Sequence, residues 1–159
     1  MRRRVYIETT AVSYLVARPS RDVVLAGRQA ATRDFWAMLP ERFEPYVSAL
    51  VHEEAQRGDA EQARRRTDAI RTFAMLDVDA DAERLAAELL AASAVPASCP
   101  EDAVHLAIAA VNGMDILVTW NFAHLNNPFT RRAVRRAIEA AGFVSPEVCS
   151  PEELLEAEP

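Results

Sequence analysis

The chain has 159 residues and a formal net charge of -6, and all 18 of its basic side chains are arginine. This acidic balance argues against a general nucleic-acid binder. The lack of lysine excludes a P-loop, a Schiff-base lysine and a Ser-x-x-Lys acylating pair, and the four widely spaced glycines exclude a dinucleotide fingerprint. Two isolated cysteines, with no visible leader or membrane segment, predict a cytoplasmic protein, and we expect one domain over residues 1–159. We interpret Cys99 and Cys149 as small buried hydrophobic residues.

Hydrophobic period and helix punctuation predict strands alternating with helices. In chain order, we expect a strand at 5–7, helices at 9–16 and 21–39, a strand at 45–48, helices at 49–57 and 59–73, a strand at 75–78, helices at 79–92 and 100–112, a strand at 116–119, a helix at 131–141, a strand at 146–149 and a short helix that opens at 151 with a capping box. This alternation predicts an α/β fold with a mainly parallel sheet.

In such folds the functional site lies outside the carboxyl ends of the strands. Glu8 directly follows the first predicted strand, where an acid is a poor strand former. Two acids follow the second strand and occupy different faces of their helix. Glu53 lies four residues before Arg57 and suits an exposed ion pair, whereas Glu54 lies four residues after Leu50 and points toward the apolar side. Local structure therefore explains Glu53 and leaves Glu54 as a candidate site residue.

A similar comparison separates the two acids that begin the helix at 100–112. Residues 98–101 fit a capping box, which gives Glu101 a structural role. Asp102 begins a helix that is apolar nearly all round and is therefore predicted to be buried. The structural alternative for Asp102 is favourable charge at a helix N-terminus. His105 lies one turn further on, and we interpret it as a hydrogen-bonded partner of Asp102 rather than as a ligand.

Asn121 follows the strand at 116–119, where it is either a turn residue or a further site residue. Parallel strands would bring Asn121 to the same edge as Glu8, Glu54 and Asp102. Mg²⁺ and Mn²⁺ prefer such hard oxygen ligands. Without a cation, mutual repulsion would raise the pKa of at least one of these carboxyl groups.

Four segments together resemble the successive motifs of PIN-domain ribonucleases, and the likeness is greatest to the VapC-type toxins of bacterial toxin–antitoxin pairs. The segments are residues 5–15, 47–54, 102–107 and 119–124, and the resemblance covers nearly the whole chain. It implies a three-layer sandwich with a mainly parallel sheet of four to five strands and helices on both faces. It also implies endoribonuclease activity that depends on Mg²⁺ or Mn²⁺, a cognate antitoxin protein as partner, and a homodimer.

The resemblance assigns Glu8, Glu54 and Asp102 as metal-binding and catalytic acids, with Asn121 at the fourth catalytic position. It implies supporting roles for residues beside these acids, namely Thr10, Thr119 and His124. Thr10 would orient Glu8, while His124 would either contact phosphate or fix its own loop. Glu8 stands where Asp is usual, and the neutral Asn121 leaves a formal charge of about −3. One cation should therefore bind more firmly than a second.

For the binding of an RNA substrate, the positions of the charged residues along the chain matter more than the net charge. Residues 1–72 carry 13 arginines and 10 acids, a balance of +3, whereas residues 73–159 carry 5 arginines and 14 acids, a balance of −9. The arginines that follow the Asn121 loop are favoured for phosphate contact over a purely solvated role. They are Arg131, Arg132, Arg135 and Arg136.

Two other classes of function share these features. One is a PIN-like RNA- or protein-binding module with little or no catalysis, which the departures at Glu8 and Asn121 leave open. The other is a phosphoacceptor domain or a phosphatase with an Asp nucleophile. Both members of this second class normally use a lysine to bind the phosphoryl group, and this chain has none.

Overall fold

Five parallel strands form one sheet in the order β3-β2-β1-β4-β5. The computed structural model describes residues 1–157. Within them the strands are β1 (Arg3–Ile7), β2 (Phe43–Ser48), β3 (Ala74–Leu76), β4 (Ile116–Val118) and β5 (Glu147–Cys149). The predicted α/β fold with a parallel sheet is confirmed, and each of the five strands lies close to its predicted place.

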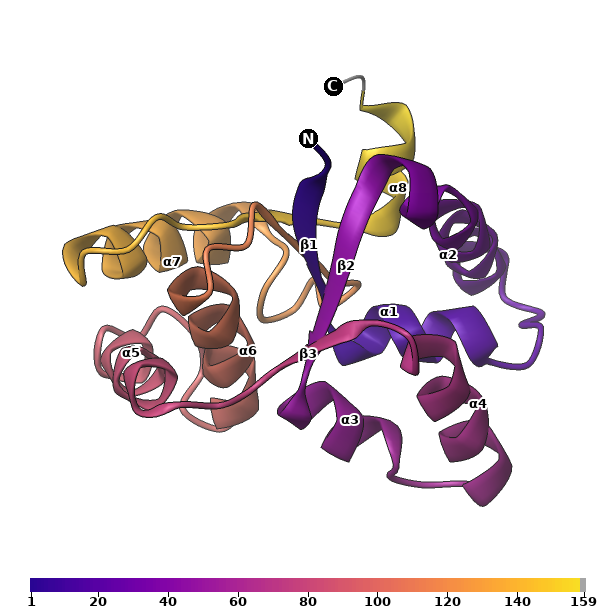
Figure 1. Ribbon diagram of the computed structural model, residues 1–159, viewed down its shortest axis with the longest axis horizontal. Helices are drawn as coiled ribbons and strands as arrows, with labels where there is room; N and C mark the ends of the chain where they lie inside the picture. The colour runs from indigo at the N-terminus through magenta and orange to yellow at the C-terminus, as the bar shows by residue number, and fades with distance from the viewer. Residues whose placement is uncertain (158–159) are drawn as a thin grey trace.

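Helices cover both faces of this sheet, as the predicted sandwich requires. In chain order they are α1 (Thr9–Val16), α2 (Val23–Arg42), α3 (Ala49–Ala55), α4 (Ala60–Ile70), α5 (Ala80–Ala91), α6 (Pro100–Val111), α7 (Pro128–Ala140) and α8 (Pro151–Glu156). In Figure 1, α5, α6 and α7 lie on one side of the strands, and α1, α2, α4 and α8 lie on the other. Right-handed crossovers between parallel strands produce this arrangement.

The central strand β1 places the candidate site. Its last three residues, Val5, Tyr6 and Ile7, are completely buried, as expected for a strand covered on both faces. β1 pairs with β2 on one side and with β4 on the other, and Ile7 lies level with Val118 of β4. The backbone N–H of Glu8 continues this pairing and donates to the Val118 carbonyl at 3.0 Å. Figure 1 shows α1 and α3 beginning at the same end of the sheet, where β1 and β2 finish.

Several helix boundaries differ from the prediction by up to three residues, and α2 and α7 are the two cases that involve a proline. We expected a helix over 21–39 that stops before Pro40, but α2 runs from Val23 to Arg42 and is capped by the Asp22 side chain. Pro40 removes one backbone donor, and so close to the end of the helix this loss does not stop the last turn. α7 begins three residues earlier than expected, because Asn127 caps it and Pro128 occupies its first position.

The last helix has the capping box that the sequence predicts. The hydroxyl of Ser150 accepts from the backbone of Glu153, and the Glu153 carboxylate accepts from the backbone of Ser150. α8 packs against α2, where the guanidinium of Arg42 donates to the carbonyl of Ala157 at 3.0 Å. Among residues 1–157, every helix is too short or too polar to cross a membrane.

Candidate metal centre and active site

Glu8 is a buried carboxylate held by two threonines. It caps α1: its Oε2 accepts from the backbone N–H of Thr10 at 2.6 Å. Its Oε1 accepts from the hydroxyls of Thr10 at 2.9 Å and Thr119 at 2.8 Å. Burial raises the pKa of Glu8 above its ordinary value, against the opposing effects of the His105 charge and of these hydrogen bonds. The orienting contact that the resemblance implies for Thr10 is present in the geometry.

Glu54 lies at the carboxyl edge on α3, facing inward as its helical position predicts. Its Oε1 accepts from the Thr9 hydroxyl at 2.7 Å and lies 2.6 Å from Nε2 of His105. Burial would raise the pKa of Glu54, but the hydrogen bond to His105 and the charge of His105 outweigh it, so this pKa is lowered. The hydrogen bonds among the described residues all use Oε1, which leaves Oε2 open to a ligand. Glu53 makes the exposed ion pair predicted for it, 3.4 Å from Arg57.

His105 is buried in the middle of the acids. Its Nδ1 lies 2.7 Å from the hydroxyl of Tyr6, which in turn lies 2.8 Å from the hydroxyl of Ser48. Burial would lower the pKa of His105, but its hydrogen bond to Glu54 and the charges of Glu8, Glu54 and Asp102 outweigh that effect and raise it. When His105 is protonated, it donates to Glu54 through Nε2 and to Tyr6 through Nδ1.

The interpretation of His105 as a partner of Asp102 is wrong. His105 points from α6 toward the ends of β1 and β2, where Glu54 is within reach. Asp102 turns instead toward the loop after β4. Its Oδ1 accepts from the Asn121 amide at 3.3 Å, and its Oδ2 lies 2.9 Å from Nδ1 of His124.

Asn121 shapes the loop after β4 as well as contacting Asp102. Its side-chain oxygen accepts from the backbone N–H of His124 at 3.0 Å, and its own backbone N–H donates to the Thr119 hydroxyl at 2.9 Å. The first of these bonds spans three residues, which is the spacing at which an Asn side chain caps the start of a helical turn. Both interpretations of Asn121, as a turn residue and as a neighbour of the acids, therefore describe the same side chain.

Glu8, Glu54 and Asp102 all interact electrostatically with His105, but their carboxylates do not meet at one point. Among the described residues, Glu8, Glu54 and Asp102 do not form a set of three potential ligands within 4.8 Å of one another. Repulsion between carboxylates opposes closer approach without a cation, and each is held apart by its own partners. The donor set nonetheless suits a divalent cation, because it offers three carboxylates and an open oxygen on Glu54.

The one set of three within 4.8 Å among residues 1–157 consists of Cys99, Asp102 and His124. The sequence interpretation missed Cys99, which is half-buried instead of buried. It caps α6 without a side-chain capping bond, so the predicted capping box over residues 98–101 is wrong. Because Pro100 occupies the first helical position, Cys99 is the N-cap residue. One sequence feature could have identified Cys99 as a candidate ligand: it lies three residues before Asp102, on the same helical face.

Cys149, also expected to be buried, is half-buried on β5. Its surroundings disfavour the thiolate. Burial, together with the neighbouring charges of Glu153 and Glu147, raises the pKa of Cys149 to about 11.

Two of the four arginines favoured for phosphate contact are already paired with acids. Arg131 lies 3.5 Å from Glu153, and Arg135 makes two bonds to Glu147 at 2.8 and 2.9 Å. Arg132 and Arg136 are exposed and make no ion pair with the described acids. Arg131, Arg132 and Arg135 line a hollow of about 460 Å³ beside β5.

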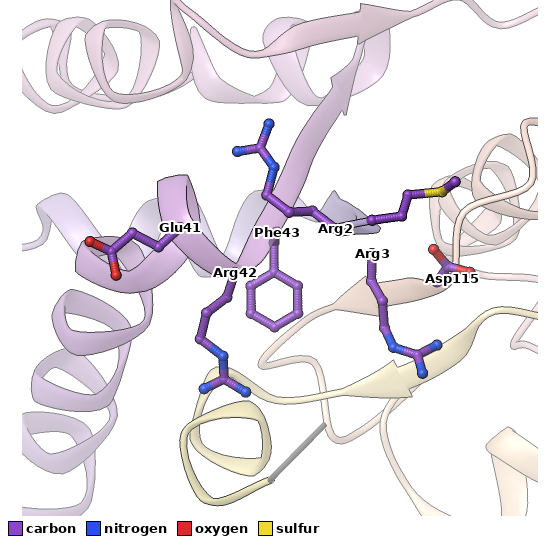
Figure 2. Close-up of a pocket in the computed structure, with 7 residues that line it drawn as sticks. Arg2, Arg3, Glu41, Arg42, Phe43 and Asp115 are labelled. Atoms are coloured by element: carbon purple, nitrogen blue, oxygen red, sulfur yellow. The ribbon is translucent and has the colours of Figure 1, made fainter.

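A larger cavity lies at the amino edge of the sheet, at the other ends of the strands from the site acids. It has a volume of about 790 Å³ and is lined by the residues that begin β1 and β2, among them Arg2, Arg3 and Phe43. Figure 2 shows the side chains of Arg3, on β1, and of Arg42, at the end of α2, extending toward the yellow ribbon of β5 and α8. Because Glu8 follows the other end of β1, this cavity is separate from the acids.

The sheet order, the helices on both faces and the acids beyond the strand ends define a PIN-like α/β fold. Comparison with known structures identifies it more narrowly as the fold of VapC-type toxins. VapC20 from Mycobacterium tuberculosis, described as a toxin that cleaves the sarcin–ricin loop, matches 88% of this chain and 96% of its own, with a TM-score of 0.56 and 22% identity. VapBC2 from Rickettsia felis, in a complex with promoter DNA, matches 92% and 98%, with a TM-score of 0.56 and 13% identity. No family sequence model and no curated protein sequence matches the chain.

Proposed function

We propose that this protein is a metal-dependent endoribonuclease and the toxin of a toxin–antitoxin pair. The observation that carries the proposal is the position of Glu8, Glu54 and Asp102 around His105, beyond the carboxyl ends of the central strands. Local helix and strand structure gives Glu54 no other role. The shared fold with VapC20, a toxin that cleaves RNA of the sarcin–ricin loop, supports the choice of RNA as the substrate.

Glu8, Glu54 and Asp102 would hold Mg²⁺ or Mn²⁺, and Asn121 would support Asp102 beside them. Such a cation supplies Lewis acidity that activates water and offsets the charge on the phosphodiester. Thr10 and Thr119 fix the buried Glu8.

His105 holds Glu54 in place through Nε2, and its raised pKa favours a positive charge beside the acids. His124 lies at the exposed side of Asp102, with about a third of its side chain accessible, where it can contact the RNA phosphate or product. Arg132 and Arg136, which are exposed on α7 further along the chain, would add phosphate contacts. Hydrolysis at this site requires no protein nucleophile.

The antitoxin would bind near α1 and α2. Val23 and Val24 at the start of α2 are 86% and 61% exposed, which is unusual for aliphatic side chains and typical of a surface covered by a partner. A homodimer and a cytoplasmic location complete the proposal, with residues 1–159 as one domain. Co-expression with the protein encoded by the neighbouring reading frame tests the antitoxin directly.

RNA cleavage by single variants tests the activity. We expect Asp102→Asn and Glu54→Gln to lower the rate of cleavage of a structured RNA by roughly 100-fold or more, since each removes a carboxylate that would hold the cation. Glu53→Gln is the matched control, because Glu53 is adjacent in sequence but exposed and paired with Arg57. Equal cleavage by Glu54→Gln and Glu53→Gln would overturn the assignment.

A catalytically weak or inactive binding module is the second candidate function. It is favoured by the neutral Asn121 and by the burial of Glu8, since burial raises the pKa of that carboxyl and weakens it as a ligand. Calorimetric titration with Mn²⁺ separates the two proposals. Binding below millimolar Mn²⁺ that Asp102→Asn removes supports the nuclease, and no binding at millimolar Mn²⁺ supports the module.

A further inference from the structure

Cys99, Asp102 and His124 bring three different ligand atoms together. A sulfur, a carboxylate oxygen and an imidazole nitrogen lie within 4.8 Å of one another, and all three residues are half-buried. Cys99 and Asp102 come from the first turn of α6, whereas His124 comes from the loop after β4. The fold therefore joins two segments that are distant in sequence at this point.

Local structure does not account for the thiol of Cys99. This residue caps α6 but makes no side-chain capping bond, and its Sγ has a single weak contact, 3.8 Å from the hydroxyl of Ser98. The loop that presents His124 is fixed independently, because Asn121 accepts from the backbone of His124. The imidazole is thus held beside Asp102 and Cys99 by a preformed turn.

We propose that Cys99, Asp102 and His124 form a binding site for a transition metal of the Zn²⁺ type, distinct from the site for Mg²⁺ or Mn²⁺. Thiolate and imidazole ligands select Zn²⁺ over the hard cations that carboxylates alone prefer. Three protein ligands leave a fourth tetrahedral position for water.

The geometry needs only side-chain adjustment to bind such an ion. Tetrahedral ligands at ordinary Zn–S, Zn–N and Zn–O distances lie about 3.3–3.8 Å apart. The separation between Oδ2 of Asp102 and Nδ1 of His124 is 2.9 Å, so this pair would open slightly. Cys99 would rotate toward the pair and lose its thiol proton on binding.

This site shares Asp102 with the proposed catalytic centre. A Zn²⁺ ion held by Cys99 and His124 would occupy the Asp102 carboxylate and so withdraw it from the catalytic cation. We therefore expect zinc to inhibit RNA cleavage, a consequence that rests on the proposed function. The binding site itself does not depend on that function.

Cobalt binding tests the site without any measurement of activity. Co²⁺ is added to the reduced, metal-stripped full chain, and the thiolate-to-cobalt charge-transfer absorption is recorded. We expect one equivalent to bind to the wild type and to Cys149→Ser, and we expect Cys99→Ser to weaken binding by roughly 100-fold or more, since it removes one of three protein ligands. No such absorption in the wild type, or its persistence in Cys99→Ser, would overturn the proposal.

Serine at position 99 is a sound test because it suits the position structurally. Serine is among the preferred N-cap residues, so Cys99→Ser should preserve α6. Thermal unfolding provides a second measurement on the same proteins. Zn²⁺ should raise the melting temperature of the wild type and of Cys149→Ser but not of Cys99→Ser, because only binding to the folded state stabilises it. An equal shift in all three proteins would also overturn the proposal.

The inhibitory consequence is measured by cleavage assays with Mn²⁺ present. We expect Cys99→Ser to cleave RNA at the wild-type rate and to need at least about tenfold more zinc for half-inhibition. Equal zinc sensitivity of the two proteins would overturn the proposed inhibition. The cobalt measurement would still decide whether the binding site exists. Absence of cleavage by the wild type would overturn the proposed function and leave the cobalt and melting results to decide the site.

Discussion

Hydroxyl groups orient two of the three acids of this site, Glu8 and Glu54. Thr10 and Thr119 donate to Glu8, and Thr9 donates to Glu54. A buried carboxylate is tolerated only when such donors satisfy it. The threonines therefore contribute to stability as well as to the arrangement of the site.

The bond from Thr119 to Glu8 gives a prediction about stability. We expect Thr119→Val to lower the free energy of unfolding of the metal-free protein by about 1–3 kcal/mol, because it leaves a buried acceptor with one donor fewer. Urea unfolding measures this change. Thr72→Val is the control, since Thr72 is exposed and makes no side-chain hydrogen bond among the described residues. A loss for Thr119→Val no larger than that for Thr72→Val would contradict the account of Glu8.

The raised pKa of His105 predicts how stability depends on pH. Folding raises this pKa above the unfolded value of about 6.5, so the folded state retains the proton longer. The stabilisation is therefore complete below about pH 6.5 and is lost as pH rises through the folded pKa. The lowered pKa of Glu54 acts in a different range, because its stabilisation is lost as pH falls below about 4.5.

Urea unfolding of the metal-free protein between about pH 6 and 9 measures the His105 contribution. We expect stability to fall with rising pH in the wild type and in His52→Gln, and to change much less in His105→Gln. The comparison uses slopes, so a uniform loss of stability in His105→Gln does not affect it. A slope in His105→Gln equal to that of the wild type would show that another group titrates in this range.

At the scale of elements, the order of strands and helices and the ends of the strands were readable from the sequence, whereas several helix caps were not. The alternation of apolar runs with capped helices was sufficient to place five strands and eight helices in the described residues. It also brought Glu8 and the start of α3 to one edge, because parallel strands have their carboxyl ends together. Boundaries shifted by up to three residues, both beside a proline, as at Pro40 and Pro128, and without one, as at the end of α4.

Side-chain direction on α6 could not be read from the sequence. His105 and Asp102 share a helical face, and yet one reaches Glu54 and the other reaches His124. The packing of α6 against the sheet decides this difference, and helical period alone does not describe that packing. For the same reason, the sequence did not identify Cys99 as a candidate ligand, because His124 comes from a loop more than twenty residues further along the chain.

The capping box of α8 gives a prediction at this scale. We expect Ser150→Ala to lower the free energy of unfolding by about 0.5–2 kcal/mol, because it removes the hydroxyl that accepts from the Glu153 backbone. Ser98→Ala is the matched control, since Ser98 is exposed and caps no helix. Equal stability of these two variants in urea unfolding would contradict the role of the box.

At the scale of the whole molecule, the charges differ between the two edges of the sheet. The cavity at the amino edge is lined by three arginines together with Glu41 and Asp115, whereas the carboxyl edge carries the site acids around His105. The net charge of -6 does not reveal this separation. A bound cation would offset the negative carboxyl edge, so that an anionic substrate could approach an acidic protein.

The dependence of RNA cleavage on Mn²⁺ tests the central claim most directly. Metal-stripped protein is incubated with a structured RNA over a range of Mn²⁺ concentrations, with Asp102→Asn in parallel. The account predicts cleavage that rises from background to saturation with Mn²⁺, that excess chelator abolishes, and that Asp102→Asn lacks. Cleavage by the wild type that is unchanged in excess chelator, or equal cleavage by Asp102→Asn, would contradict it.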